Sequence, residues 1–151
     1  MVHSGKRDVA LQNGDVKRQD IAKAGEQLAA AYLCQKGYAI TCRNWRSGRF
    51  AEIDLIVSHS SGLQVFVEVK TRRLSKDASP HDELGFSSID RRKRRKILIA
   101  AASYLSSSAR NDQSSRIDAI VIYYSAADKQ DGKTELKGVR ITHVESAFDS
   151  I

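Results

Sequence analysis

Hydrophobic residues recur at helical spacing in two segments of the chain. Within residues 15–36 the apolar positions follow three- and four-residue steps and form a stripe of Ala22, Ala29, Ala30 and Leu33. Gly37 lies just past the last turn, where a glycine favours the end of a helix. In residues 88–107 a second helical pattern follows Ser87 and Asp90, whose spacing resembles a capping box. We therefore predict one helix in each segment.

Five further segments have the composition or the alternation of β-strands, namely 38–43, 52–58, 63–71, 116–124 and 139–144. The turn at 59–62 gives the strongest hairpin signal, and the last strand has an edge-like composition. Polar segments at 44–49, 74–85 and 128–138 are expected to be loops or turns. The order α-β-β-β-α-β-β predicts an α/β or α+β fold with a mixed sheet flanked by helices.

Composition narrows the class of protein. The chain has 151 residues, of which 41% are hydrophobic and 28% charged, as in ordinary soluble globular proteins. We expect a single domain over 16–151, preceded by a flexible tail over 1–15. No apolar run approaches the roughly 18 residues of a membrane span, and the first residues are too polar for a signal peptide. A cytoplasmic protein with no membrane partner is therefore expected.

Acidic residues interrupt the otherwise apolar strands of the predicted hairpin. Because side chains alternate between the two faces of a strand, Ile53, Leu55 and Val57 are expected to share one face of the first arm. In the second arm Glu68 and Lys70 point the same way. An acid and an amine therefore lie side by side on one face of the sheet.

The register of the hairpin brings two acids together. Centring the turn near Ser61 sets Asp54 opposite Glu68 and Leu55 opposite Val67, which matches apolar with apolar residues. Opposed carboxylates repel each other, so stability alone does not favour this pair. A divalent cation reverses the repulsion, and oxygen ligands suit magnesium. We therefore take Asp54 and Glu68 as candidate metal ligands.

Glu26 adds a third acid, because it falls within the apolar stripe of the first helix. A buried, unpaired carboxylate costs several kcal/mol or shifts its pKa until it is neutral, and a nearby cation removes that cost. Gly25 and the neighbouring alanines would let the helix approach the sheet closely. Each acid alone is more simply a solvated residue, but perturbed acids that converge are typical of a functional site.

Several segments together resemble a known family. Gly25-Glu26, Asn44-Trp45-Arg46 and the hairpin segments 52–56 and 65–72 resemble the bacterial YraN-like family of uncharacterised proteins. That family is similar to the PD-(D/E)XK nuclease superfamily, which includes restriction endonuclease-like proteins and archaeal Holliday-junction resolvases. The resemblance covers about residues 20–148 and implies a restriction-endonuclease-like α-β-β-β-α-β core.

The resemblance also implies chemistry. Asp54 and Glu68 match the two metal-binding acids, Lys70 matches the motif lysine, and Glu26 matches the helix acid of many such nucleases. These four would be the catalytic residues, with magnesium or manganese held by Asp54, Glu68 and Glu26. The implied reaction is phosphodiester hydrolysis in DNA, branched or damaged substrates being the narrower expectation. By analogy with resolvase-like proteins, a homodimer is expected as well.

A basic surface fits a nucleic-acid partner. The chain carries 25 Lys and Arg against 18 Asp and Glu, a net charge of +7, and 91–96 is a run of six cations. The helix macrodipole disfavours cations at a helix N-terminus, whereas contacts with phosphates would explain them. The residues that we expect to bind nucleic acid are Arg46, Arg72, Arg92, Lys93 and Arg95. Two alternatives stay open: a non-catalytic nucleic-acid-binding module that keeps the nuclease fold, and a scaffold with no nucleic-acid partner.

Overall fold

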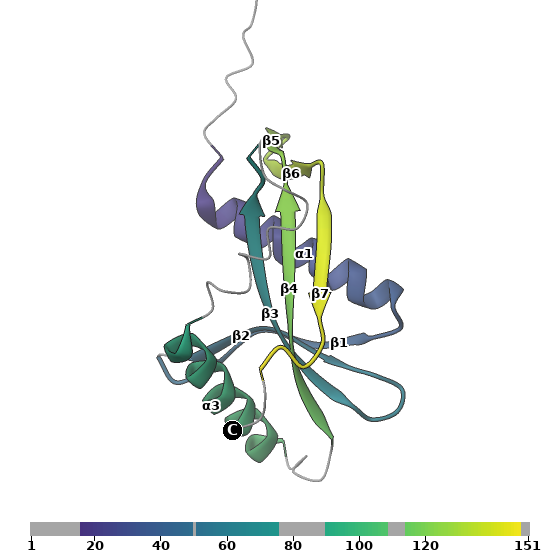
Figure 1. Ribbon diagram of the computed structural model, residues 1–151, viewed down its shortest axis with the longest axis vertical. Coiled ribbons are helices and arrows are strands. Elements are labelled where there is room, and N and C mark those ends of the chain that lie inside the picture. Colours follow the sequence, from purple (N-terminus) through teal and green to yellow (C-terminus); the bar gives the residue numbers. More distant parts are fainter. Residues whose placement is uncertain (1–15, 50, 76–89, 109–113, 149–151) are drawn as a thin grey trace, which may run out of the picture.

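A mixed β-sheet forms the centre of the molecule (Figure 1). The computed structural model describes residues 16–49, 51–75, 90–108 and 114–148. In this part of the chain a five-stranded sheet has the order β1-β2-β3-β4-β7, formed by β1 (Ala39–Ser47), β2 (Ala51–Ser58), β3 (Gln64–Arg73), β4 (Ser115–Tyr124) and β7 (Arg140–Val144). Only β3 and β4 pair in parallel among these neighbours. A mixed sheet in an α/β fold was expected, and it is confirmed.

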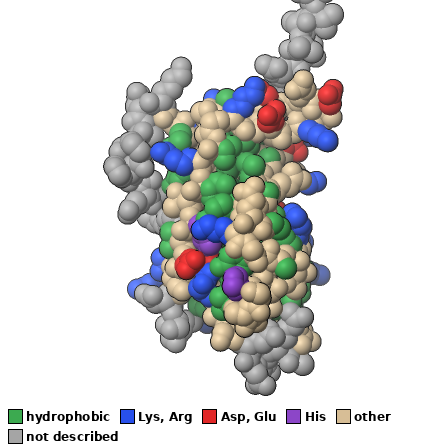
Figure 2. Space-filling view, turned by 90° about the vertical axis from the view of Figure 1, so that its right-hand side faces the viewer, with side chains coloured by type: hydrophobic (Ala, Val, Ile, Leu, Met, Phe, Trp, Pro, Cys, Tyr) green, Lys and Arg blue, Asp and Glu red, His purple; other side chains and the backbone are tan. Residues whose placement is uncertain are grey.

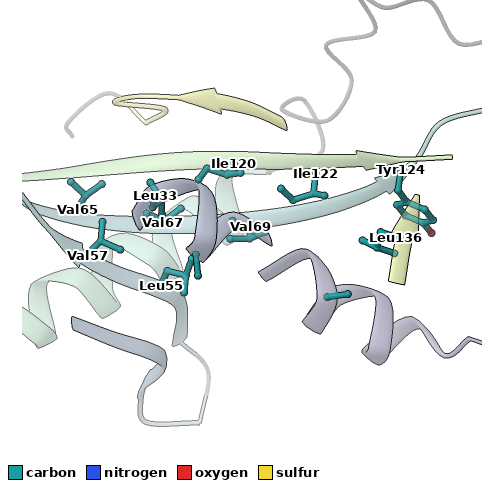
Figure 3. Packing of buried hydrophobic residues seen from close by; sticks show 13 residues of the cluster. Leu33, Leu55, Val57, Val65, Val67, Val69, Ile120, Ile122, Tyr124 and Leu136 are labelled. Carbon is teal, nitrogen blue, oxygen red and sulfur yellow. The ribbon is translucent and has the colours of Figure 1, made fainter. Parts of the chain in front are cut away.

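Two helices cover opposite faces of this sheet. Helix α1 (Arg18–Gln35) packs Leu33 against residues of β2, β3 and β4, which face the helix in Figure 3. Helix α3 (Arg91–Ser107) joins β3 to the parallel strand β4 and packs Ala100 and Tyr104 against Phe66 on the other face. The order α1-β1-β2-β3-α3-β4 is the expected α-β-β-β-α-β core.

The first strand is longer than the sequence indicated. Residues 44–47 were expected to lie in a loop, but they continue β1 and pair with β2, as in Trp45 with Ile53. The half-buried ring of Trp45 lies edge-on to Tyr104 at 5.4 Å between centroids, so it packs against the core. A register shift between Ile40 and Cys42 interrupts the ladder. The polar residues Asn44, Arg46 and Ser47 made this segment resemble a loop in the sequence.

The segment 128–138 is also not the polar turn that we expected. It belongs to a second, two-stranded sheet made of β5 (Ala126–Gln130) and β6 (Lys133–Lys137). Asp131 and Gly132 connect the strands with φ values of 52° and 74°. An Asp-Gly pair with both residues at positive φ favours the turn of a tight hairpin, so the sequence did carry a signal for it.

The helix starts differ from the expected ones. Helix α1 begins at Arg18 rather than near residue 15, which lies outside the described residues. The N-cap of α3 is Asp90, whose Oδ1 accepts a hydrogen bond from the backbone N–H of Lys93 at 2.8 Å. The helix therefore begins after Asp90 and not after Ser87. Ser87, the tail 1–15 and most of the loop 74–85 lie outside the described residues. Within the described part of the chain, no helix is both long and apolar enough to cross a membrane.

Candidate functional site

Strands β2 and β3 separate at Asp54. The ladder pairs Val57 with Val65 and Leu55 with Val67, which confirms the expected register. Beyond Leu55 the backbone N–H of Val69 donates to the Asp54 carboxylate, with 2.8 Å between N and Oδ2. Strand β3 continues to Arg73 along β4, and Figure 1 shows the two running on together past the point where β2 turns away. The acid side chain therefore takes the position of a main-chain hydrogen-bond acceptor at the fork of the sheet.

The alternation of β2 also breaks at this fork. Leu55 and Val57 pack toward α1, whereas Ile53 packs toward α3 with Ile56. The expectation that Ile53, Leu55 and Val57 share one face was therefore wrong. The change of face falls where the β2–β3 ladder ends at Leu55 and Val67, next to the Asp54 carboxylate that accepts from Val69.

The carboxyl groups of Asp54 and Glu68 lie in contact at the fork. Glu68 is only 3% exposed. Burial, followed by the charge of Glu68, raises the pKa of Asp54 to about 8, although the N–H of Val69 partly opposes the shift. In the metal-free protein the raised pKa of Asp54 therefore favours its protonated form at neutral pH. This is the electrostatic conflict that the hairpin register predicted.

Glu26 reaches the same fork from helix α1. Burial raises its pKa, and the charges of Glu52 and Glu68 raise it further, while a hydrogen bond with Asn44 opposes them. Asn44 has a φ of 50° in the middle of β1, and the left-handed conformation is one that asparagine tolerates better than most residues. The sequence pattern places Asn44 only within the Asn44-Trp45-Arg46 segment and does not predict its contact with Glu26.

Helix α1 comes this close because of a glycine. A Cβ atom at Gly25 would overlap the hydroxyl of Thr71 on β3 and lie 3.0 Å from the Thr71 Cβ. The helix backbone therefore rests directly against the strand that carries Glu68, as the small residues of the stripe suggested. Glu26, the next residue, is held beside the sheet by this contact.

Two lysines surround the Glu68 carboxylate. Lys93 Nζ lies 2.8 Å from Glu68 Oε1, and Lys70 Nζ lies 3.8 Å from the same oxygen. Burial lowers the pKa of Lys70, and the charge of Lys93 lowers it further. Burial acts against the charged form of Lys93 too, but the hydrogen bond and the charge of Glu68 outweigh it, so the pKa of Lys93 is raised.

The donor set fits a magnesium ion in part. Among the described residues, no group of three or more His, Cys, Asp and Glu side chains is arranged to hold a metal ion. Asp54 and Glu68 meet directly, whereas Glu26 interacts with both only through its charge. Proteins usually hold magnesium through one or two carboxylates together with water and substrate phosphates, so two apposed carboxylates suffice.

Comparison with known proteins places the chain in a family. The profile of the uncharacterised protein family UPF0102 matches residues 25–122. The chain belongs to UPF0102. The resemblance to YraN-like proteins is thereby confirmed at the level of the family. The matched range contains all four residues expected to be catalytic, namely Glu26, Asp54, Glu68 and Lys70.

Individual relatives carry the same UPF0102 name. A UPF0102 protein of Trichlorobacter lovleyi is 34% identical over 131 residues, which cover 87% of this chain and 91% of that relative. A UPF0102 protein of Bacteroides thetaiotaomicron is 41% identical over 78 residues, and one of Rhodococcus jostii is 52% identical over 63 residues. These two matches cover 52% and 42% of this chain, and 63% and 52% of the respective relatives.

The cations expected to bind nucleic acid are spread around the UPF0102 site. Arg92 and Arg95 are exposed on α3. Arg72 lines a cavity of about 460 Å³ between α1 and the end of β3, together with Glu26 and Lys70. Arg46 is 73% exposed, and its Nε lies 3.3 Å from Glu52. The fifth of these residues is Lys93, which contacts Glu68 instead of projecting with the others.

A second charged cluster in this UPF0102 fold was not predicted. Asp118 of β4 is fully buried and accepts hydrogen bonds from Arg116 Nε at 2.7 Å and from the backbone N–H of Ser146 at 3.1 Å. His143 Nε2 lies 2.8 Å from Asp118 Oδ2. The surface view in Figure 2, on the side of the molecule where β7 lies, shows histidine, basic and acidic side chains close together. Burial opposes the ionised form, but the bonds to His143 and Arg116 lower the pKa of Asp118. The contacts with His143 and Ser146 tie β4 to the C-terminal segment, whereas Arg116 lies on β4 itself and also donates to the Tyr38 hydroxyl at 2.9 Å. These contacts between elements indicate a structural role.

Proposed function

We propose that this UPF0102 protein is a nuclease that hydrolyses phosphodiester bonds in DNA with magnesium or manganese held by Asp54 and Glu68. The contact between these two buried carboxyl groups carries the proposal. Two apposed acids do not stabilise a fold, because burial and the charge of Glu68 raise the pKa of Asp54 to about 8. Such a conflict is typical of sites that are completed by a cation. The resemblance to PD-(D/E)XK nucleases supports the same assignment.

Each residue of the site has a part in this reaction. A bound metal ion would lower the pKa of a coordinated water and neutralise charge on the scissile phosphate. Lys70 lies beside Glu68, and its lowered pKa suits it to orient the attacking water or to accept its proton. Glu26 lies on the wall of the cavity that also contains Lys70 and Arg72. The leaving oxygen of the DNA departs as the water oxygen bonds to phosphorus.

The DNA would be held by the basic surface around the site. Arg92 and Arg95 project from α3, and Arg72 follows Lys70 along the edge of β3. Contacts of this kind are made with phosphates and carry no sequence preference by themselves. Branched or damaged DNA is the substrate class that we propose to test first.

We also propose that the protein forms a homodimer, which sedimentation of the free protein would test.

A second candidate function is binding of nucleic acid without hydrolysis. It is favoured by the ion pair between Lys93 and Glu68, because the lysine already supplies a cation to the buried carboxylate. Both functions predict DNA binding that weakens with salt. Only metal-dependent cleavage separates them.

The deciding experiment compares the wild type with Asp54→Asn and Glu68→Gln. The substrates are branched, nicked and single-stranded DNA, each with magnesium or manganese. We expect cleavage by the wild type and none by either variant. The matched control is Asp128→Asn, which removes an exposed carboxylate that pairs with Lys137 at 2.7 Å and should cleave normally. Absence of cleavage by the wild type would leave the binding function, and full activity of both variants would refute the site.

A further inference from the structure

Lys93 differs from its neighbours Arg92 and Arg95 on α3, because its side chain contacts a buried carboxylate. Its backbone N–H is fixed by the cap at Asp90, so the start of α3 is anchored in place. The side chain bends to Glu68 and places Nζ 2.8 Å from Oε1, although 44% of that side chain is exposed. A buried carboxylate is thus neutralised by an ammonium group that reaches it from solvent.

This position is the one that a divalent cation on Glu68 would need. Magnesium is bound through carboxylate oxygens at about 2.0–2.1 Å and keeps several waters around it. An ammonium group at hydrogen-bond distance from the same oxygen would meet those waters and repel the metal charge. Lys70 is farther from this oxygen, at 3.8 Å, and is the less direct competitor.

We propose that Lys93 acts as the resident cation of Glu68, and that a divalent metal ion and the Lys93 ammonium group exclude each other on this carboxylate. The proposal rests on the proposed metal site. Because the backbone of Lys93 is capped, displacement requires only a rotation of the flexible side chain. The released ammonium group joins Arg92 and Arg95 on the exposed surface of α3.

Metal binding and DNA binding are therefore coupled. In the metal-free protein the Lys93 ammonium group is held by Glu68, and in the metal-loaded protein it is released to contact a phosphate. By linkage, the metal strengthens DNA binding by the same factor by which DNA strengthens metal binding. Without a metal ion Lys93 neutralises the charge of Glu68. Once the metal ion is bound, Lys93 contacts the DNA phosphates together with Arg92 and Arg95.

The test measures metal affinity on the protein alone. Titration calorimetry with magnesium or manganese compares the wild type with Lys93→Met and with Lys137→Met, a control that removes an ammonium group from the exposed Asp128 at a similar distance. We expect Lys93→Met to bind the metal about tenfold more tightly, within the range of typical couplings, and the control to match the wild type. Lys93→Arg should weaken metal binding, since a guanidinium grips a carboxylate with two bonds.

The outcomes separate this inference from the proposed function. If the wild type binds metal and both Lys93 variants bind it with unchanged affinity, the competition is refuted while the metal site stands. If Lys93→Met does not fold without metal, Lys93→Arg alone decides between these two results. If no variant binds metal, the proposed site itself fails. The wild type should bind a labelled DNA duplex more tightly in the presence of calcium than in its absence. If calcium strengthens DNA binding by Lys93→Met to the same extent, the release of Lys93 toward a phosphate is refuted.

Discussion

Replacing Asp54 by asparagine should make the metal-free protein more stable at alkaline pH. The carboxyl group of Asp54 has a pKa of about 8 in the folded protein and an ordinary value of 3.8 in the unfolded chain. Below pH 3.8 Asp54 is protonated in both the folded and the unfolded state, so its ionisation does not change the stability. Between pH 3.8 and about pH 8 Asp54 is ionised in the unfolded chain but protonated in the folded protein. The stability of the folded protein therefore falls as the pH rises through this range and stays low above it. Asparagine is neutral throughout and can still accept the hydrogen bond from Val69.

The size of the effect follows from the same interval. A difference of one pKa unit corresponds to about 1.4 kcal/mol, so the shift of Asp54 can lower the stability of the folded protein by at most about 6 kcal/mol. Lys70 and Lys93 already lie at Glu68 and can turn toward an ionised Asp54, which removes much of the penalty. We expect Asp54→Asn to be more stable than the wild type by about 2 kcal/mol at pH 8, and the gain to vanish near pH 4.

Urea denaturation at pH 4, 6 and 8 in the presence of a chelator measures this difference. Asp128→Asn serves as the control, because its carboxylate is exposed and paired, and it should not gain stability with pH. Added magnesium should stabilise the wild type by mass action and leave Asp54→Asn unchanged. A variant that is less stable than the wild type at pH 8, or a difference that does not change with pH, would show that Asp54 pays no electrostatic penalty.

Three other predictions concern the packing and the basic surface. Gly25→Ala should lower the free energy of unfolding in urea by about 1–2 kcal/mol, because the overlap with Thr71 outweighs the helix propensity of alanine. Adding Thr71→Ala to this variant should restore part of the lost stability. A Gly25→Ala protein that is more stable than the wild type would contradict the close contact. Asp118→Ala should cost about 3 kcal/mol, since it leaves buried partners unpaired, and a loss well under 1 kcal/mol would contradict the structural role. Arg92→Ala and Arg95→Ala should each lower the slope of log affinity against log salt on duplex DNA by about 0.9, and an unchanged slope would exclude a phosphate contact.

The sequence by itself determined the main elements and the pair of acids. The alternation of residues in β2 and β3, with a short turn between them, left one register that buries valine against leucine, and this register opposed Asp54 to Glu68. Such information is local, because a slip of one residue turns every side chain of a strand to the other face. Gly25 beside Glu26 likewise indicated a helix that rests against the sheet. The Asp131-Gly132 hairpin is equally local, because an Asp-Gly pair with both residues at positive φ favours a tight turn.

Only the tertiary structure decided which groups neutralise these acids. The place of Lys93 depends on how α3 crosses the sheet, and nothing in a run of six cations shows which one turns inward. The same holds for Asn44, whose contact with Glu26 depends on how α1 packs against the sheet. It holds also for Asp118, whose partner His143 lies on the neighbouring strand β7, 25 residues further along the chain. Contacts between residues far apart in the chain are set by the packing of whole elements, whereas periodicity reports only which face of its own element a residue occupies.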